Sequence, residues 1–171
     1  MTNRVGNIAV CGIYCGACPH FQGRIRESAI SFRDWLDGWN FGDVAPFILP
    51  PGMNYPGFRE VLSAIANHEP CGGCREQANP LCPIKLCAKG RNAATCAECD
   101  RFVGDINKPC NNEEPLGIFR LISRRYSGWN LENLKRIREV GVEKFIDEME
   151  QKISKGFNAC EVISKEKVFS R

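Results

Sequence analysis

The distribution of cysteine constrains this chain more than any other feature of its sequence. The chain has 171 residues, and ten of its eleven cysteines lie between Cys11 and Cys110. About one residue in ten of this span is therefore a cysteine, a density typical of small folds held together by disulfides or by metal ions.

The cellular compartment of the protein decides whether disulfides or metal ions are expected. Disulfides persist in oxidising compartments, which proteins reach through a targeting segment. The sequence before Cys11 has a single basic residue and no long apolar run, so we expect no signal peptide. The odd number of cysteines also disagrees with complete pairing. We therefore expect a cytoplasmic chain whose cysteines are metal ligands, nucleophiles or small buried side chains, the last being the expected role of the isolated Cys160.

The spacing of the cysteines favours metal. Three C-x-x-C pairs occur, at Cys15/Cys18, Cys71/Cys74 and Cys96/Cys99. A tetrahedral zinc ion usually takes two such pairs, or one pair with two further cysteines or histidines. The predicted ligands are Cys11, Cys15, Cys18, Cys71, Cys74, Cys82, Cys87, Cys96, Cys99 and Cys110.

Ten ligands do not divide into groups of four. His20 follows Cys18 by two residues and His68 precedes Cys71 by three, so the two histidines could complete a third site. The alternative is two four-cysteine sites with two thiols left over. We therefore predict one to three zinc ions. An iron–sulfur cluster is the alternative cofactor, because Cys18-Pro19 and Cys82-Pro83 match a step found in ferredoxins, although the compact ferredoxin run of four cysteines is missing.

The sequence offers little support for catalysis. The C-x3-C-x2-C spacing of Cys11, Cys15 and Cys18 is also that of radical S-adenosylmethionine enzymes, but the chain lacks their alternating strand and helix pattern. Neither histidine lies near a nucleophile motif. We expect a non-catalytic binding or scaffold module with an unidentified protein partner, and a thiol enzyme that uses an exposed C-x-x-C pair is a further alternative.

Apolar spacing predicts a mainly α protein with little or no β-sheet. Apolar residues recur at helical spacing within residues 21–39 and 58–65, and the Gly- and Pro-rich segment 40–57 between them is predicted to be a loop. After Pro115 we expect three C-terminal helices, with Asn130 as the N-cap of the second and Gly141 before the third.

The cysteine-rich middle of the chain has too few apolar residues to bury a core of its own, so metal must organise it. Short helical turns are expected there at residues 84–89 and 97–103. We predict a single domain made of an N-terminal cysteine clip (8–20), helices and a loop (21–69), the metal segment (70–112), C-terminal helices (113–155) and a tail of coil or short strand (156–171).

The formal net charge of +3 comes from the C-terminal third, where residues 116–171 hold 12 basic and 8 acidic side chains. Zinc sites beside a basic, aromatic-bearing stretch could bind nucleic acid. This excess of basic side chains is small for a nucleic-acid-binding surface. We therefore favour the interpretation that the basic residues lie on a solvent-exposed helix face and that Trp129 lies in the core. No apolar run reaches the roughly 18 residues of a membrane span. The densest basic group comprises Arg120, Arg124, Arg125, Lys135, Arg136 and Arg138, with Tyr126 and Trp129 between them.

The joint cysteine motif resembles a family of small cysteine-rich prokaryotic proteins classed as a domain of unknown function. The matching segments are Cys11-Gly-Ile-Tyr-Cys15-Gly-Ala-Cys18-Pro19, Cys71-Gly-Gly-Cys74-Arg75, Cys82-Pro-Ile84-Lys85-Leu-Cys87-Ala88-Lys89-Gly90 and Cys96-Ala-Glu98-Cys99. Residues 131–139 resemble the family's usual C-terminal helix. The resemblance implies a cytoplasmic bacterial or archaeal protein, often from anaerobes, that binds metal and has no assigned reaction.

Overall fold

The computed structural model describes residues 4–76 and 81–164 of the chain. These residues divide into two compact units. Residues 19–71 form one unit, which we call the hairpin unit. Residues 4–18 combine with the described residues from 72 onward to form the other, which we call the cysteine unit. Each unit has its own hydrophobic core, so each is described separately.

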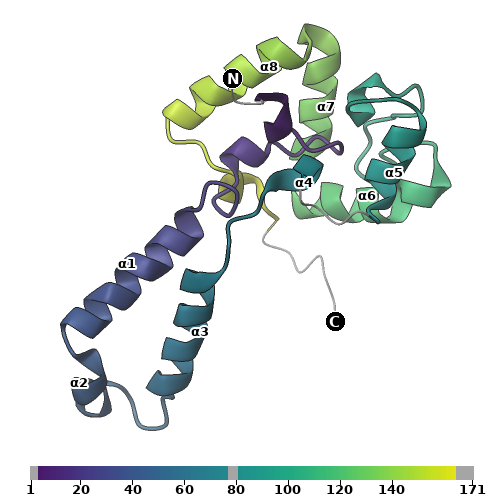
Figure 1. Ribbon diagram of the computed structural model, residues 1–171. Helices are drawn as coiled ribbons and strands as arrows, with labels where there is room; N and C mark the ends of the chain where they lie inside the picture. Colours follow the sequence, from purple (N-terminus) through teal and green to yellow (C-terminus); the bar gives the residue numbers. More distant parts are fainter. Residues whose placement is uncertain (1–3, 77–80, 165–171) are drawn as a thin grey trace. The chain divides into compact units, whose positions relative to one another are not determined.

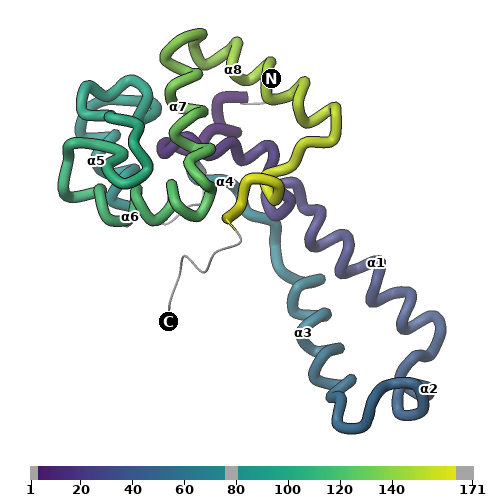
Figure 2. Tube along the Cα trace, turned by 180° about the vertical axis from the view of Figure 1, so that it is seen from behind, coloured from purple at the N-terminus to yellow at the C-terminus, as the bar shows by residue number. Residues whose placement is uncertain are grey.

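The hairpin unit consists of three helices. Helix α1 (Arg24–Gly38) and helix α3 (Tyr55–Asn67) lie side by side, and the short helix α2 (Phe41–Ile48) connects them (Figures 1 and 2). Asn54 caps α3, because its side-chain oxygen accepts a 3.0 Å hydrogen bond from the backbone N–H of Gly57. The core is thin and comprises Ala29, Leu36, Leu62 and Ala66, with Ile30, Phe41 and Tyr55 packed against it.

The two long helices of this unit were predicted, but the loop predicted for residues 40–57 is wrong for its first half, which forms α2. The loop was predicted because the segment is rich in Gly and Pro, which usually interrupt helices. The apolar residues Phe41, Val44 and Ile48 recur at helical spacing and outweigh them. Pro46 lacks the N–H of a regular helical residue, and α2 ends two residues beyond it.

The cysteine unit is also helical. It contains α4 (Gly73–Glu76), α5 (Pro83–Gly90), α6 (Glu113–Arg125), α7 (Trp129–Val140) and α8 (Val142–Ser154). Single 3₁₀ turns lie at Arg4–Asn7, Cys15–Ala17, Cys96–Glu98 and Ala159–Val162. Within residues 4–76 and 81–164 the only β pairing is two isolated antiparallel bridges, Ile8 with Tyr14 and Phe102 with Cys110. The mainly α prediction is therefore confirmed.

The core of the cysteine unit joins α7 and α8 to the N-terminal segment. The predicted apolar stripes are buried, with Leu134 on α7 and Ile146 on α8 among the least exposed side chains. The ring of Tyr14 packs edge-on against Phe145 with centroids 6.0 Å apart. This packing fixes the segment that carries the first three cysteines against two long helices.

The predicted N-cap role of Asn130 is wrong. Helix α7 begins at Trp129, two residues earlier than an Asn130 N-cap implies, and its N-cap is Gly128 in the left-handed conformation (φ 82°). Asn130 therefore lies inside the helix, fully buried, where its amide donates to the carbonyl oxygen of Cys11 at 3.1 Å and to Ser123 Oγ at 3.2 Å. A buried polar side chain needs such partners, and this requirement explains an asparagine at that position.

Two local predictions need correction. The helical turn expected at residues 97–103 is limited to the 3₁₀ turn Cys96–Glu98, because the chain then extends to the bridge at Phe102. Cys160 is exposed rather than buried, since it lies on a surface turn capped by Asn158. The tail, predicted from residue 156 onward as coil or short strand, is irregular except for the 3₁₀ turn Ala159–Val162, and its last residues, 165–171, lie outside the described residues. No helix in the part of the chain that the structure describes is long and apolar enough to cross a membrane.

Candidate metal centres

Four of the predicted ligands gather around one small cavity in the cysteine unit. Cys87 comes from α5, Cys96 and Cys99 flank a 3₁₀ turn, and Cys110 lies in the bridge to Phe102. We call these four residues the central group. The cavity has a volume of about 20 Å³, and its remaining walls are Ile84, Arg101, Phe102, Asn112, Pro115 and Phe119.

The Cys96–Cys99 turn of this group is held from two sides. Within the turn, the backbone N–H of Cys99 donates to the carbonyl of Cys96 at 3.2 Å. From α7, the guanidinium of Arg138 donates to the carbonyl of Ala97 at 2.5 Å and to that of Cys99, and it lies 4.8 Å above the ring of Phe102. A planar guanidinium can satisfy both carbonyls at once, so Arg138 fixes the turn that presents the two thiols.

Asn112 connects the other two sulfurs of the central group. Its side-chain amide donates to Cys87 Sγ at 3.0 Å, and its backbone carbonyl accepts from Cys110 Sγ at 3.4 Å. The thiol of Cys99 donates to Asp100 Oδ1 at 3.7 Å. Among residues 4–76 and 81–164, no three side chains of His, Cys, Asp or Glu already adopt an arrangement that could hold a metal ion. Rotation of the thiols away from these partners would be needed for ligation.

Burial raises the pKa of the thiols of Cys96 and Cys110, and neighbouring cysteine sulfurs raise both pKa values further. A hydrogen bond with Cys87 raises the pKa of the guanidinium of Arg91. These sulfurs are therefore close enough to disfavour one another's ionisation. A bound cation would reverse that preference, because thiolates in contact with a metal ion lose their protons.

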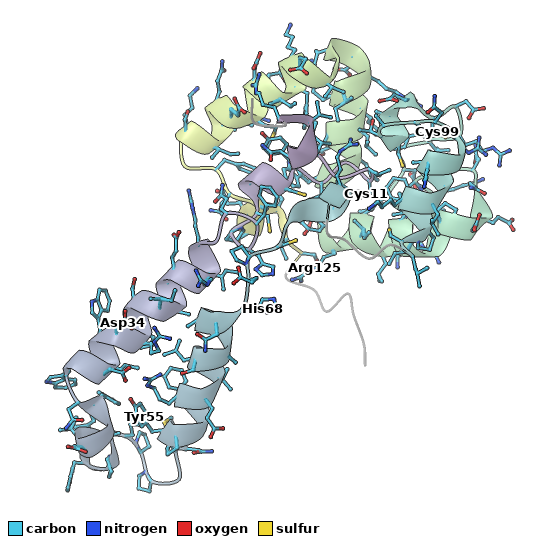
Figure 3. All side chains as sticks on the ribbon, in the orientation of Figure 1. Cys11, Asp34, Tyr55, His68, Cys99 and Arg125 are labelled. Atoms are coloured by element: carbon cyan, nitrogen blue, oxygen red, sulfur yellow. The ribbon has the colours of Figure 1, made fainter. Side chains whose placement is uncertain are left out.

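A second group of cysteines lies in the N-terminal part of the same unit. Cys15 and Cys18 flank the 3₁₀ turn Cys15–Ala17, in which the N–H of Cys18 donates to the carbonyl of Cys15 at 2.8 Å. The turn matches that of the central group, because Cys18 (φ −83°, ψ 123°) and Cys99 (φ −85°, ψ 130°) leave it in the same conformation. Figure 3 labels Cys11 and Cys99, one from the neighbourhood of each turn.

Cys15 makes a thiol–thiol contact with a residue far away in the sequence. The thiol of Cys74, on α4, hydrogen-bonds Cys15 and lowers the pKa of Cys15 to about 7, with help from the backbone N–H groups of Cys74 and Ala9. Burial acts in the opposite direction and, at Cys11, raises the pKa to about 12. Cys15 therefore ionises more readily than Cys11. Cys11 also lies close enough to Cys15 and Cys82 to interact with them electrostatically.

Three predicted ligands lie in the hairpin unit. The backbone N–H of Cys71, whose side chain is exposed, donates to the carbonyl of His20 at 3.4 Å. The rings of His20 and His68 stack with centroids 5.5 Å apart and planes inclined by 17°. The two histidines thus lie together as a third site would require, and their role as ligands stays a prediction.

Three of the six residues in the dense basic group of the C-terminal third make contacts within the cysteine unit. Arg136 pairs with Glu148 at 2.5 Å, Arg124 donates to Asn107 at 2.9 Å, and Arg138 binds the turn carbonyls described above. Trp129 is buried, as expected for a core residue.

Asn112, Asn130 and Arg138 position cysteines, a role that was not predicted for any of them. Arg138 is exposed overall, and no local pattern indicates that its guanidinium reaches the carbonyls of Ala97 and Cys99. Asn112 and Asn130 do not belong to any sequence motif that marks a residue near a metal site. Only the tertiary structure shows that their amides reach Cys87 and Cys11.

Comparison with known proteins gives one family. Neither the curated proteins nor the solved structures include a significant match to the chain. Residues 7–111, which hold ten of the eleven cysteines and both histidines, match a family described as "Protein of unknown function (DUF3795)". The resemblance drawn from the cysteine motifs is thereby confirmed, and the chain belongs to the DUF3795 family.

Proposed function

We propose that this protein binds zinc through Cys87, Cys96, Cys99 and Cys110, and that the ion organises a non-catalytic binding or scaffold module. The observation that carries the proposal is the convergence of these four cysteines, from three separate segments, on one small cavity. Four thiols are a complete ligand set for structural zinc, with no position left for substrate.

The surroundings of the cavity suit a bound ion. Ile84, Phe102 and Phe119 form apolar walls, and an apolar shell limits the access of water to a metal site. The volume of about 20 Å³ is comparable to the space of one water molecule. This size favours a single ion over an iron–sulfur cluster, which remains the alternative cofactor of the proposal.

A second zinc site is proposed at the N-terminal cysteine group. Its support is the Cys15–Cys18 turn, which repeats the conformation of the Cys96–Cys99 turn, and the direct contact of Cys15 with Cys74. Cys11 and Cys82 are further candidate ligands there. Cys71, His20 and His68 stay candidates within the hairpin unit, which keeps the proposed stoichiometry at one to three ions per chain.

The proposed setting is a reducing cytoplasm, where thiols stay available for metal. There the ion would replace the hydrophobic core that the Pro-, Gly- and Asn-rich segment between α4 and α6 lacks. The shaped loops around the central group would then offer a surface to a protein partner.

Metal analysis of the protein tests the proposal. Protein purified without added metal should contain about one to three zinc ions per chain and no visible absorbance. Cys96→Ser should lose about one equivalent of zinc and unfold at a lower temperature, whereas the exposed Cys160→Ser should retain the wild-type content. Metal-free protein that is fully folded would contradict the proposal. A brown sample with broad visible absorbance would support the iron–sulfur alternative instead.

A further inference from the structure

The two proposed zinc sites of the cysteine unit are joined by a backbone hydrogen bond. The N–H of Cys96, from the central group, donates to the carbonyl of Val10 at 2.9 Å, and Val10 directly precedes Cys11. The thiols of Cys11 and Cys96 also lie close enough together for the sulfur of Cys11 to raise the pKa of Cys96. A displacement of the N-terminal segment therefore also displaces a proposed ligand of the central group.

The side chain of Arg75 joins the same two segments a second time. Arg75 follows Cys74 on α4, which lies against the N-terminal segment (Figure 1). Its Nε donates to the carbonyl of Ile8 at 2.8 Å, and its Nη2 donates to the carbonyl of Ala94 at 2.9 Å. Ile8 belongs to the N-terminal segment, and Ala94 lies two residues before Cys96. The rigid fork of one guanidinium thus connects α4 to both other segments.

Helix α5 takes part in the same network of hydrogen bonds. Lys85 on α5 donates from Nζ to the backbone carbonyl of Arg75 at 3.2 Å. Along the chain, Lys85 lies between Cys82, a candidate ligand of the N-terminal cysteine group, and Cys87 of the central group. Arg75 therefore contacts the N-terminal segment, α5 and the chain that leads into the Cys96–Cys99 turn.

These shared contacts make the ordering of the two sites interdependent. The segment between α4 and α6 has too few apolar residues to fold alone, so a bound ion must offset the conformational entropy that is lost when this segment becomes ordered. An ion at one site orders the segments that Arg75 connects, and these segments also carry ligands of the other site. The second ion therefore meets a smaller ordering cost than the first.

Electrostatic repulsion between the two sites acts in the opposite direction. A zinc ion with four thiolate ligands carries net negative charge, so two such sites close together repel each other. The positive charges of Arg75 and Lys85 lie where the segments of the two sites meet, and they reduce this repulsion. The guanidinium of Arg75 already acts on one candidate ligand, because it helps to lower the pKa of Cys15. With the repulsion reduced, the shared ordering decides the sign of the coupling.

We propose that Arg75 couples the two zinc sites of the cysteine unit, so that zinc bound at one site raises the zinc affinity of the other. This coupling rests on the proposed function, since it requires two zinc sites. The effect is reciprocal by thermodynamic linkage, and couplings of this kind change an affinity about 5- to 150-fold. The cysteine unit therefore exists mainly without zinc or with both ions, and it changes between these states over a narrow range of zinc concentration.

Native mass spectrometry tests the coupling, because it counts the zinc ions on each chain while reduced, metal-free protein is titrated with zinc acetate. The full-length Cys71→Ser variant lacks the exposed candidate ligand of the hairpin unit, which confines the count to the cysteine unit. Two independent sites, whatever their affinities, leave at least half of the chains with one ion when half of the sites are filled. We expect about a quarter or less, which corresponds to coupling of at least about tenfold.

Substitution of Arg75 in the same protein tests the role of the guanidinium. Arg75→Gln should still bind two ions per chain, but the one-ion fraction at half filling should rise to half or more, because the fork and its charge are lost. Arg75→Lys keeps the charge and should give an intermediate fraction, and it replaces Arg75→Gln if circular dichroism shows that the latter does not fold with zinc. Arg120→Gln, at an exposed position of α6, should retain the small one-ion fraction.

The outcomes separate the coupling from the zinc sites themselves. Two ions per chain with a one-ion fraction of half or more in the Cys71→Ser protein overturn the coupling and leave both zinc sites in place. A small one-ion fraction that persists unchanged in the Arg75 variants that fold overturns the role of Arg75. Chains that bind one ion at most contradict the second zinc site, and chains that bind none contradict the proposed function. Either of these last two results also overturns the coupling.

Discussion

The side-chain amide of Asn130 on α7 and the backbone carbonyl of Cys11 form a buried hydrogen bond of 3.1 Å between residues 119 positions apart. The neighbouring amide of Asn133 donates in the same way to the carbonyl of Gly12 at 2.9 Å. Helix α7 therefore binds the backbone of the N-terminal cysteine segment directly, while Arg138 on the same helix binds the Cys96–Cys99 turn. One helix thus positions cysteines of both groups.

Replacing Asn130 should destabilise the protein through the N-terminal segment. Asn130→Ala leaves the buried carbonyl of Cys11 without this donor, and we expect a loss of about 1–3 kcal/mol in the free energy of unfolding. Urea denaturation of the metal-loaded protein measures this change. Asn111→Ala, at an exposed position, should stay within about 0.5 kcal/mol of the wild type. Equal stability of the two variants would contradict the structural role of Asn130.

Gly12 and Gly117 should respond in opposite directions to alanine. Gly12 has a φ of +90°, and an added Cβ would meet the Asn130 carbonyl and lie 2.6 Å from Leu134 Cγ, so Gly12→Ala should cost about 2 kcal/mol or more. Gly117 lies within α6 with open space around its Cα, and Gly117→Ala should stabilise by about 0.5–1 kcal/mol. Thermal unfolding of both variants is the measurement. A neutral Gly12→Ala would mean that this segment does not pack against α7 as described.

The helices could be predicted because their periodicity is local. Apolar residues repeat at helical spacing in α1, α3 and α8. Burial follows the pattern in α8, whereas Ile25 and Phe32 of α1 and Val61 of α3 are exposed although they carried it. Helix α2 was missed because Pro46 and the neighbouring glycines outweighed a short apolar pattern. The start of α7 was misplaced because Asn130 is a good N-cap in isolation, whereas its tertiary partner is Cys11.

Arg138 should be required for the geometry of the central group. Arg138→Lys keeps the charge but cannot reach the carbonyls of Ala97 and Cys99 in the same plane, so we expect a loss of about 1–2 kcal/mol in stability and faster release of zinc to a chelator. Arg120→Lys, at an exposed position of α6, is the matched control. Identical chelation rates for both variants would show that the turn is fixed without Arg138.

Cys15 should ionise near neutral pH in the reduced, metal-free protein. Its pKa in the folded protein is about 7, below its ordinary value of 9, chiefly because of the hydrogen bond from Cys74. A lowered pKa stabilises the folded state above pH 9, and this contribution is lost as the pH falls through 7. Thiolate absorbance near 240 nm follows the titration.

Cys74→Ala removes the donor while Cys15 stays buried, so the pKa of Cys15 should rise. Cys160→Ala should leave the titration near pH 7 in place. If Cys74→Ala titrates like the wild type, the contact between Cys15 and Cys74 is not what lowers the pKa.

The candidate ligands could be predicted individually, but their grouping could not. The spacing of Cys96 and Cys99 indicates a shared ion without indicating that Cys87 and Cys110 join them. Their convergence depends on the packing of α5 against α6 and on the bridge between Phe102 and Cys110, both of which are tertiary. The contact of Cys15 with Cys74 likewise joins residues separated by 59 positions, which no local pattern specifies.

X-ray absorption at the zinc edge of the loaded protein tests the central claim most directly. The Cys15→Ser/Cys74→Ser double variant confines the measurement to the central group. For this variant we predict about one zinc ion per chain with four sulfur neighbours at about 2.3 Å. An additional Cys87→Ser or Cys110→Ser substitution should abolish this four-sulfur site. A shell of oxygen or nitrogen at about 2.0–2.1 Å, or zinc that dialysis removes completely, would contradict a four-cysteine centre at Cys87, Cys96, Cys99 and Cys110.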